Sequence, residues 1–127
     1  KIIGIGVDIV EIKRISLLLK RNKRFKKRIF SKKEISHCDK KNNFYSCYAK
    51  RFAAKESFAK ALGIGISNGL NFNEIEVINN SKGKPTINLL GSSKKIVKKI
   101  INNKKFETKL SLSDEKKYAI AMLILST

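Results

Sequence analysis

The stretch GIGVDIVEIKRI, Gly4 to Ile15, places one carboxylate, Asp8, in an otherwise apolar segment that begins with two closely spaced glycines. Residues 2 to 10 are apolar and largely β-branched, which predicts a buried strand. An ionised carboxylate among such neighbours is costly unless it is paired, hydrogen-bonded or bound to a metal ion. The simplest alternative is an acid at the strand end that caps the following helix. Asp8 therefore needs a partner from elsewhere in the chain.

The size of the chain, 127 residues, predicts one domain spanning residues 1–127. Its hydrophobic content of 42% is that of a globular protein, and no apolar run approaches the roughly 20 residues of a membrane-spanning helix. Cys38 and Cys47 show no Cys-x-x-Cys spacing, which supports neither a disulfide framework nor a structural zinc site. His37, the only histidine, is expected to be structural.

The charge balance is the outlier of the composition, with 29 basic against 10 acidic residues and a formal net charge of +19. Such a charge predicts an anionic partner: a nucleic acid, an anionic membrane surface, an acidic protein or a phosphorylated small molecule. Part of the excess fits the Lys-, Asn- and Ile-rich composition that AT-rich coding DNA favours. Charge alone does not choose among these partners.

Helical patterns dominate the first half of the chain. After the first strand, apolar residues recur at helical spacing in a basic stretch, at Ile12, Ile15, Leu18 and Leu19, with Leu17 widening the stripe. The sequence from Ser31 to Glu34 has the capping-box pattern and predicts a helix running toward Lys40. Residues 44 to 62 predict a long central helix that ends at Gly63.

Strand patterns follow the glycine-containing break Gly63-Ile64-Gly65. They cover residues 75–78 and 86–90, with a turn at 79–84. Ser92 or Ser93 is expected to cap a short helix whose inward face is Ile96, Val97, Ile100 and Ile101. Two final strands follow, joined by a turn at 114–116, and the continuously apolar run 119–125 suits a central strand. The pattern predicts an α+β domain with a mainly antiparallel sheet packed on the long helix.

The second candidate for chemistry is RFAAKESFAKALGIGI, Arg51 to Ile66, in which Glu56 and Lys60 are four residues apart on one helix face. The simplest interpretation is a solvated ion pair within the helix. If Glu56 and Asp8 converge, however, two hard oxygen ligands can hold Mg²⁺ and leave positions for water and substrate phosphate. Lys60 would reach the same phosphates, which is the equipment for displacement at phosphorus.

Four motifs together resemble holo-acyl carrier protein synthase, the family of small 4'-phosphopantetheinyl transferases: GIGVDIVEIKRI, RFAAKESFAKALGIGI, GKPTI at 83–87 and LSLSDEKKYAIAMLIL at 110–125. The resemblance extends over essentially the whole chain. It implies the 4'-phosphopantetheinyl transferase fold and Mg²⁺-dependent transfer of 4'-phosphopantetheine from coenzyme A to a serine of apo acyl carrier protein. Adenosine 3',5'-bisphosphate would be released, and the product would support fatty acid biosynthesis. It also implies a homotrimer with sites between subunits.

The same resemblance assigns roles to individual residues. It makes Asp8 and Glu56 the Mg²⁺ ligands and places Lys60 on the coenzyme A pyrophosphate. It also implies contacts with the nucleotide part of coenzyme A at Arg51, Gly63, Lys84 and Pro85.

A docking surface for the acidic carrier protein is implied on the basic helical stretch, at Arg14, Leu18, Arg21, Phe25 and Arg28. An apolar centre within a cationic rim suits helix docking, and the alternative for each arginine is a solvated side chain. Two positions depart from the family pattern: Lys109 stands where many relatives have histidine, and Ile64 where a smaller polar residue is common.

Two competing functions remain. A basic nucleic-acid-binding protein fits the charge, but the lysines are scattered and no aromatic array for base stacking is evident. A carrier-protein binder without catalysis would use the docking helix alone. The expected partners are therefore coenzyme A and acyl carrier protein, with neither nucleic acid nor membrane. The expected compartment is a plastid-type organelle (apicoplast) after presequence removal, or a bacterial cytoplasm.

Overall fold

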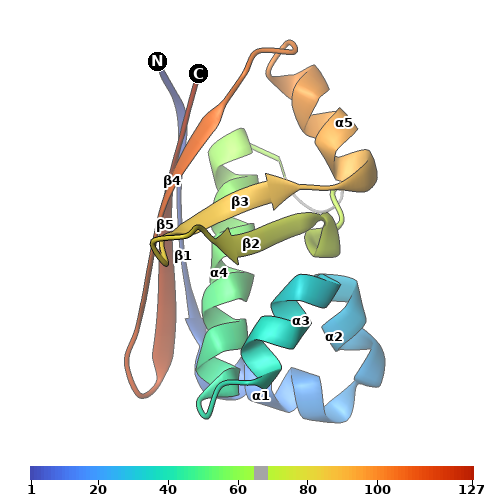
Figure 1. The fold of residues 1–127 in the computed structure, drawn as a ribbon, viewed down its shortest axis with the longest axis vertical. Coiled ribbons are helices and arrows are strands. Elements are labelled where there is room, and N and C mark those ends of the chain that lie inside the picture. Colours follow the sequence, from blue (N-terminus) through green and yellow to red (C-terminus); the bar gives the residue numbers. More distant parts are fainter. Residues whose placement is uncertain (65–68) are drawn as a thin grey trace.

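The computed structural model describes residues 1–64 and 69–127, so the end of the second motif, at 65 and 66, lies outside the described residues. A three-stranded antiparallel sheet in the order β1-β5-β4 packs on the long helix α4 (Phe44–Leu62), and the separate hairpin β2-β3 crosses α4 in Figure 1. The predicted α+β architecture is confirmed. The strands are β1 (Ile2–Glu11), β2 (Ile75–Asn79), β3 (Pro85–Leu89), β4 (Glu107–Asp114) and β5 (Tyr118–Ser126).

Strand β5 lies at the centre of the larger sheet, as its continuous apolar run predicts. It pairs antiparallel with β1, where Asp8 faces Ala121, and with β4, where Leu112 also faces Ala121. The two chain ends lie side by side, because the Lys1 amino group donates to the Thr127 carbonyl at 2.8 Å.

Helix α4 packs against β1 at backbone distance because of two glycines. A Cβ at Gly4 would lie 2.7 Å from the Ala61 carbonyl carbon, and a Cβ at Gly6 would lie 2.7 Å from that of Ser57. Two residues along a strand and four residues along a helix both span about 6 to 7 Å. Successive glycines on β1 can therefore face successive turns of α4. Asp8 is the next β1 residue on the same face, and this packing directs it toward α4.

Three shorter helices continue from β1: α1 (Ile12–Arg21), α2 (Lys23–Ile29) and α3 (Lys32–Asp39). Helix α1 follows β1 directly and buries Ile15. The capping box predicted at the start of α3 is confirmed, since Ser31 N donates to Glu34 Oε1 at 2.9 Å and Glu34 N donates to Ser31 Oγ at 3.3 Å. The predicted long helix and its stop at Gly63, with φ 77°, are also confirmed.

The prediction that Ser92 or Ser93 caps the helix near residue 92 is wrong. Helix α5 (Gly91–Ile100) has Leu90 at its N-cap, without a side-chain cap bond. Both serines lie in the first turn and donate their backbone N–H groups, each at 3.1 Å, to the carboxylate of Glu74 in the short 3₁₀ helix η2 (Phe72–Glu74). A residue far along the chain thus caps α5. Ile100, predicted to face inward, is 39% exposed.

The prediction of a buried first strand holds for one face only. Gly6 and Val10 are buried against the core, whereas the alternate residues project from the opposite face of the sheet. These exposed apolar side chains are Ile3, Ile5, Val7 and Ile9 on β1, and Ile120 and Met122 on β5. In a single chain, this face of the sheet has no cover among the described residues.

The cysteine prediction is also wrong, because Cys38 and Cys47 form a disulfide with a Cα–Cα distance of 5.5 Å. The bond joins the last turn of α3 to the first turn of α4. The short connection between the two helices brings the cysteines together, and no Cys-x-x-Cys spacing is needed for that.

A buried ion pair fixes the other side of α4. Lys55 and Glu34 have fully buried side chains, and Lys55 Nζ donates to Glu34 Oε1 at 2.6 Å. Lys55 Nζ also donates to the carbonyls of Phe72 at 2.8 Å and Ile75 at 2.6 Å, which anchors η2 and β2 on α4. Of the helices within residues 1–64 and 69–127, none combines the length and apolarity that a bilayer crossing requires.

Candidate active site

Asp8 forms an ion pair with Lys60. Lys60 Nζ donates to Asp8 Oδ1 at 3.1 Å and to the Val7 carbonyl at 3.0 Å, which joins β1 to the last turn of α4. The Asp8 side chain is 16% exposed and that of Lys60 54% exposed. The alternative in which Asp8 caps the next helix is wrong, because Glu11 occupies the N-cap of α1.

Glu56 lies within electrostatic range of Asp8, as the predicted convergence requires. Burial raises the pKa of Glu56 and the negative charge of Asp8 raises it further, while Lys60 and Arg14 act in the opposite direction. The simple ion pair between Glu56 and Lys60 does not form within the described ranges, since the ion pair of Lys60 is made with Asp8. A carboxylate whose ionised form is disfavoured by a neighbouring carboxylate is a suitable place for a divalent cation.

The donor set fits Mg²⁺. Asp8 and Glu56 offer carboxylate oxygens, the ligands that this ion prefers, and Mg²⁺ usually keeps several positions for water and substrate phosphate. In residues 1–64 and 69–127, no cluster of three or more His, Cys, Asp or Glu side chains offers a closed cage. Two carboxylate ligands leave coordination positions for water and substrate, as an open Mg²⁺ site does.

A second feature is the hollow beside Arg51, a cavity of about 530 Å³ between α3, α4, the β2-β3 turn and β4. Arg51 is only 4% exposed, and burial lowers the pKa of its guanidinium. Its Nη1 donates to Cys47 Sγ at 3.3 Å, and its Nε is the one buried side-chain nitrogen or oxygen in the described part of the chain without a hydrogen-bond partner. The described residues give Arg51 no ion pair. An anion bound in the hollow would supply the negatively charged hydrogen-bond acceptor that Arg51 lacks.

Sequence reasoning missed most of the lining of this hollow. Lys41 and Lys50 also line it, and Asp114 at its wall accepts from Ser46 Oγ at 2.5 Å and pairs with Lys50 at 3.2 Å. Lys50 directly precedes the predicted Arg51 in the sequence. This pair of basic residues was the signal that could have identified Lys50 as part of the lining.

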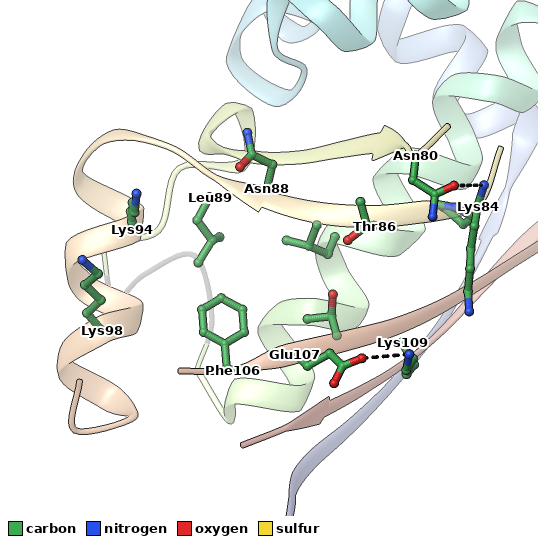
Figure 2. A pocket seen from close by; sticks show the side chains of 13 residues that line it. Asn80, Lys84, Thr86, Asn88, Leu89, Lys94, Lys98, Phe106, Glu107 and Lys109 are labelled. Carbon is green, nitrogen blue, oxygen red and sulfur yellow. Dashed lines mark hydrogen bonds and ion pairs between the residues drawn. The ribbon is translucent and has the colours of Figure 1, made fainter. Parts of the chain in front are cut away.

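The neighbouring hollow, about 500 Å³, lies between β3, α5 and β4 (Figure 2). Leu89 and Phe106 point into it, and lysines surround it, with Lys84 near one end. Lys109, one of the residues that line this hollow, pairs with Glu107 at 2.8 Å; both side chains are largely exposed, so the pair contributes little.

The residues predicted to contact the nucleotide part of coenzyme A do not all line one cavity. Arg51 and Pro85 line the same hollow, whereas Lys84 and Pro85 line the neighbouring one, so Pro85 forms a wall between the two. Gly63 lies about 18 Å along α4 from Arg51 by helical rise, and its N–H donates to the Lys60 carbonyl at 3.0 Å. Asp8, Glu56 and Lys60 line neither hollow.

The predicted docking residues lie on α1 and α2. The arginines Arg14, Arg21 and Arg28 are exposed, and Leu18 and Phe25 are partly buried against the core. The Phe25 ring lies 6.4 Å from the rings of Phe30 and Phe52. Because Arg14 also lowers the pKa of Glu56, this surface borders the carboxylate pair.

Comparisons with known proteins identify the family of the chain. The family model of the 4'-phosphopantetheinyl transferase superfamily, ACPS, matches residues 4–123. A holo-[acyl-carrier-protein] synthase of Pelagibacter ubique is 53% identical over 125 residues, which covers 98% of this chain and 97% of the relative.

Solved structures agree as well. The holo-[acyl-carrier-protein] synthase of Neisseria meningitidis gives a TM-score of 0.85 at 34% identity and full coverage of both chains. That of Helicobacter pylori, in complex with coenzyme A, gives 0.80 at 35% identity and covers 96% of this chain and 99% of that one.

The chain belongs to the 4'-phosphopantetheinyl transferase superfamily. Within it the chain groups with the holo-[acyl-carrier-protein] synthases, the enzymes that transfer phosphopantetheine from coenzyme A to acyl carrier protein. This assignment replaces both alternatives left open by the composition, a nucleic-acid-binding protein and a binder without catalysis.

Proposed function

We propose that this chain transfers 4'-phosphopantetheine from coenzyme A to a serine of apo acyl carrier protein, with Mg²⁺ held by Asp8 and Glu56 and the pyrophosphate bound by Lys60. The observation that carries the proposal is the ion pair of Lys60 on α4 with Asp8 on β1, with Glu56 one helical turn before Lys60 on the same helix. The product would serve fatty acid biosynthesis.

The chemistry is displacement at the phosphorus that carries the pantetheine arm. The serine hydroxyl oxygen forms the new P–O bond and gives its proton to solvent, while the pyrophosphate P–O bond breaks and adenosine 3',5'-bisphosphate leaves with the bonding electrons. When bound, Mg²⁺ neutralises charge on the pyrophosphate. Lys60, which is half exposed, turns from Asp8 to the phosphate oxygens and stabilises charge on the leaving group.

The nucleotide part of coenzyme A is proposed to lie along Arg51, Lys84 and Pro85, with Gly63 nearer the pyrophosphate. The unpartnered Nε of Arg51 supports this, because a buried guanidinium gains most from a charged acceptor. Lys41 and Lys50 add positive charge around the same hollow.

We propose a homotrimer with sites between subunits. The exposed apolar face of β1 and β5, including Ile5 at 62% and Ile9 at 59% exposure, is the kind of patch that a second subunit covers. A neighbour could also enclose the carboxylate pair, which lines neither hollow in one chain. Light scattering after size exclusion tests this: wild type should elute as a trimer, and Ile5→Lys should dissociate it, because the lysine charge would be buried.

Acyl carrier protein is proposed to dock on α1 and α2, with Arg14, Arg21 and Arg28 around Leu18 and Phe25. The arrangement places an apolar centre inside a cationic rim, next to Glu56. The Pelagibacter relative supports a bacterial cytoplasm over a plastid-type organelle as the compartment.

The test is the mass of an apo acyl carrier protein after incubation with the enzyme, coenzyme A and Mg²⁺, with and without EDTA. Wild type should add one phosphopantetheine, and EDTA should prevent the addition. Asp8→Asn and Glu56→Gln should lose transfer while keeping the fold, because each removes a carboxylate without removing volume. Glu115→Gln, at an exposed acid in the turn between β4 and β5, is the matched control. Full activity in Asp8→Asn would overturn the residue assignment.

A further inference from the structure

The Cys38–Cys47 disulfide lies against the proposed nucleotide site and has no part in the chemistry described so far. Cys47 lines the hollow beside Arg51 and accepts a hydrogen bond from Arg51 Nη1 at 3.3 Å. Cys38 is fully buried, and Cys47 is 6% exposed. The hollow is therefore the side from which a small reductant reaches the bond.

The bond also closes the connection between α3 and α4. Residues 40–43 form this connection, and Lys41, Asn42 and Asn43 line the same hollow. The disulfide thus constrains the 40–43 connection at the edge of the hollow and also the Cys47 sulfur that accepts from Arg51.

We infer that the Cys38–Cys47 disulfide is a redox-modifiable site that controls binding of the coenzyme A nucleotide: the bonded form leaves the charge of Arg51 available to a phosphate, and the reduced form does not. This inference rests on the proposed function, because it assumes that Arg51 binds the nucleotide.

The reduction uses a dithiol as the reducing partner. The two thiols of the partner give two electrons and two protons, the S–S bond of Cys38 and Cys47 breaks, and the partner becomes a disulfide. The enzyme is left with two thiols, one of them beside the Arg51 guanidinium.

A Cys47 thiol at that place would lie 3.3 Å from the Arg51 guanidinium and among further basic side chains. Neighbouring cations lower the pKa of cysteine thiols, and the charged or titratable groups around the hollow are mainly basic: His37, Lys41, Lys50 and Arg51, with Asp114 as the acid. The sulfur of a disulfide is neutral, whereas a Cys47 thiolate pairs with Arg51 directly. The thiolate then competes with the phosphate for the same guanidinium.

The experiment measures binding of adenosine 3',5'-bisphosphate by calorimetry, because this probe has no thiol that could exchange with the disulfide. Four samples are compared: oxidised wild type, wild type reduced with a phosphine, Cys38→Ser and Cys47→Ser. Mass spectrometry with thiol alkylation verifies the redox state of each. Cys38→Ser keeps the Cys47 thiol without the bond, and Cys47→Ser loses the bond without leaving a thiol beside Arg51.

Reduced wild type and Cys38→Ser should bind the probe about tenfold more weakly than oxidised wild type, the effect of losing one charge-assisted hydrogen bond. Cys47→Ser should stay within about threefold of the oxidised protein. Both variants lack the disulfide, so a general loss of stability would affect them alike and cannot produce the difference.

Equal affinity of oxidised and reduced wild type would overturn the inference while leaving the proposed function intact. Equal weakening in Cys38→Ser and Cys47→Ser would overturn the role given to the Cys47–Arg51 contact. If no sample binds the probe, the proposed nucleotide site is wrong, and the inference is wrong with it.

Discussion

Replacing Gly6 by alanine tests whether close packing of β1 on α4 builds the site. The new Cβ would lie 2.7 Å from the Ser57 carbonyl carbon, whereas carbon atoms pack best at about 3.5 to 4.0 Å. The Ser57 carbonyl oxygen would lie closer still, so strand and helix must separate by more than the about 0.8 Å that the carbon contact alone requires. The distance from Lys60 Nζ to Asp8 Oδ1, now 3.1 Å, would approach 4 Å and leave hydrogen-bonding range.

Two effects of the Gly6→Ala substitution should appear together. Overpacking of this kind costs about 1 to 3 kcal/mol in the free energy of unfolding, measurable by urea denaturation. A displacement of about 1 Å between catalytic groups costs up to about 100-fold in rate, measurable as the initial rate of carrier-protein modification. Gly4→Ala is the matched control, because it meets the Ala61 carbonyl in the same way but lies farther from Asp8. It should lose similar stability and less activity. Wild-type stability and rate in Gly6→Ala would refute this account of the packing.

Three further predictions concern a buried ion pair, a helix cap and the proposed docking surface. Lys55→Met should lower the free energy of unfolding by about 3 to 5 kcal/mol, because it leaves the fully buried carboxylate of Glu34 unpaired; adding Glu34→Leu should recover part of the loss in urea denaturation, and an unchanged double variant would contradict this. Burial alone would raise the pKa of Glu74, but hydrogen bonds lower it to about 2, below its ordinary value of 4.5. Its stabilisation is therefore complete above pH 4.5 and is lost as pH falls toward 2, so the stability advantage of wild type over Glu74→Gln should shrink across that interval; a pH-independent difference in thermal unfolding would contradict this. Arg14→Ala should raise the KM for acyl carrier protein about fivefold and weaken its salt dependence, with Lys95→Ala on α5 as the control; an unchanged KM would remove Arg14 from the docking surface.

Features set by nearby residues could be predicted from the sequence. The bounds of α4 and its end at Gly63 follow from a helical pattern and a residue that tolerates positive φ. The capping box of Ser31 and Glu34 needs only four consecutive residues. The central place of β5 follows from its lack of polar alternation.

Features set by contacts across elements could not be predicted in this way. Glu74 caps α5 from a separate 3₁₀ helix, and no local sequence pattern near α5 predicts this contact. The disulfide depends on how α3 turns into α4. At the site, helical spacing predicted Glu56 as the neighbour of Lys60, yet Lys60 pairs with Asp8, fifty-two residues away. The convergence of Asp8 with α4 was a hypothesis that only the resemblance made specific, because composition does not show which strand packs on which helix.

The use of the acidic residues connects the composition to the site. Of the 10 acids in the sequence, most are engaged in contacts within the fold: Asp8, Glu34, Asp39, Glu74, Glu76, Glu107 and Asp114 each have a side-chain hydrogen bond or ion pair. The negative charge of Asp8 adds to burial in raising the pKa of Glu56. Few acids are left to neutralise the 29 basic residues, so α1, α2 and the hollow beside Arg51 keep an uncompensated positive charge. That charge favours the two anionic substrates, coenzyme A and an acidic carrier protein. Glu56, one of the three acids without such a contact among the described residues, lies at the proposed metal site beside Asp8.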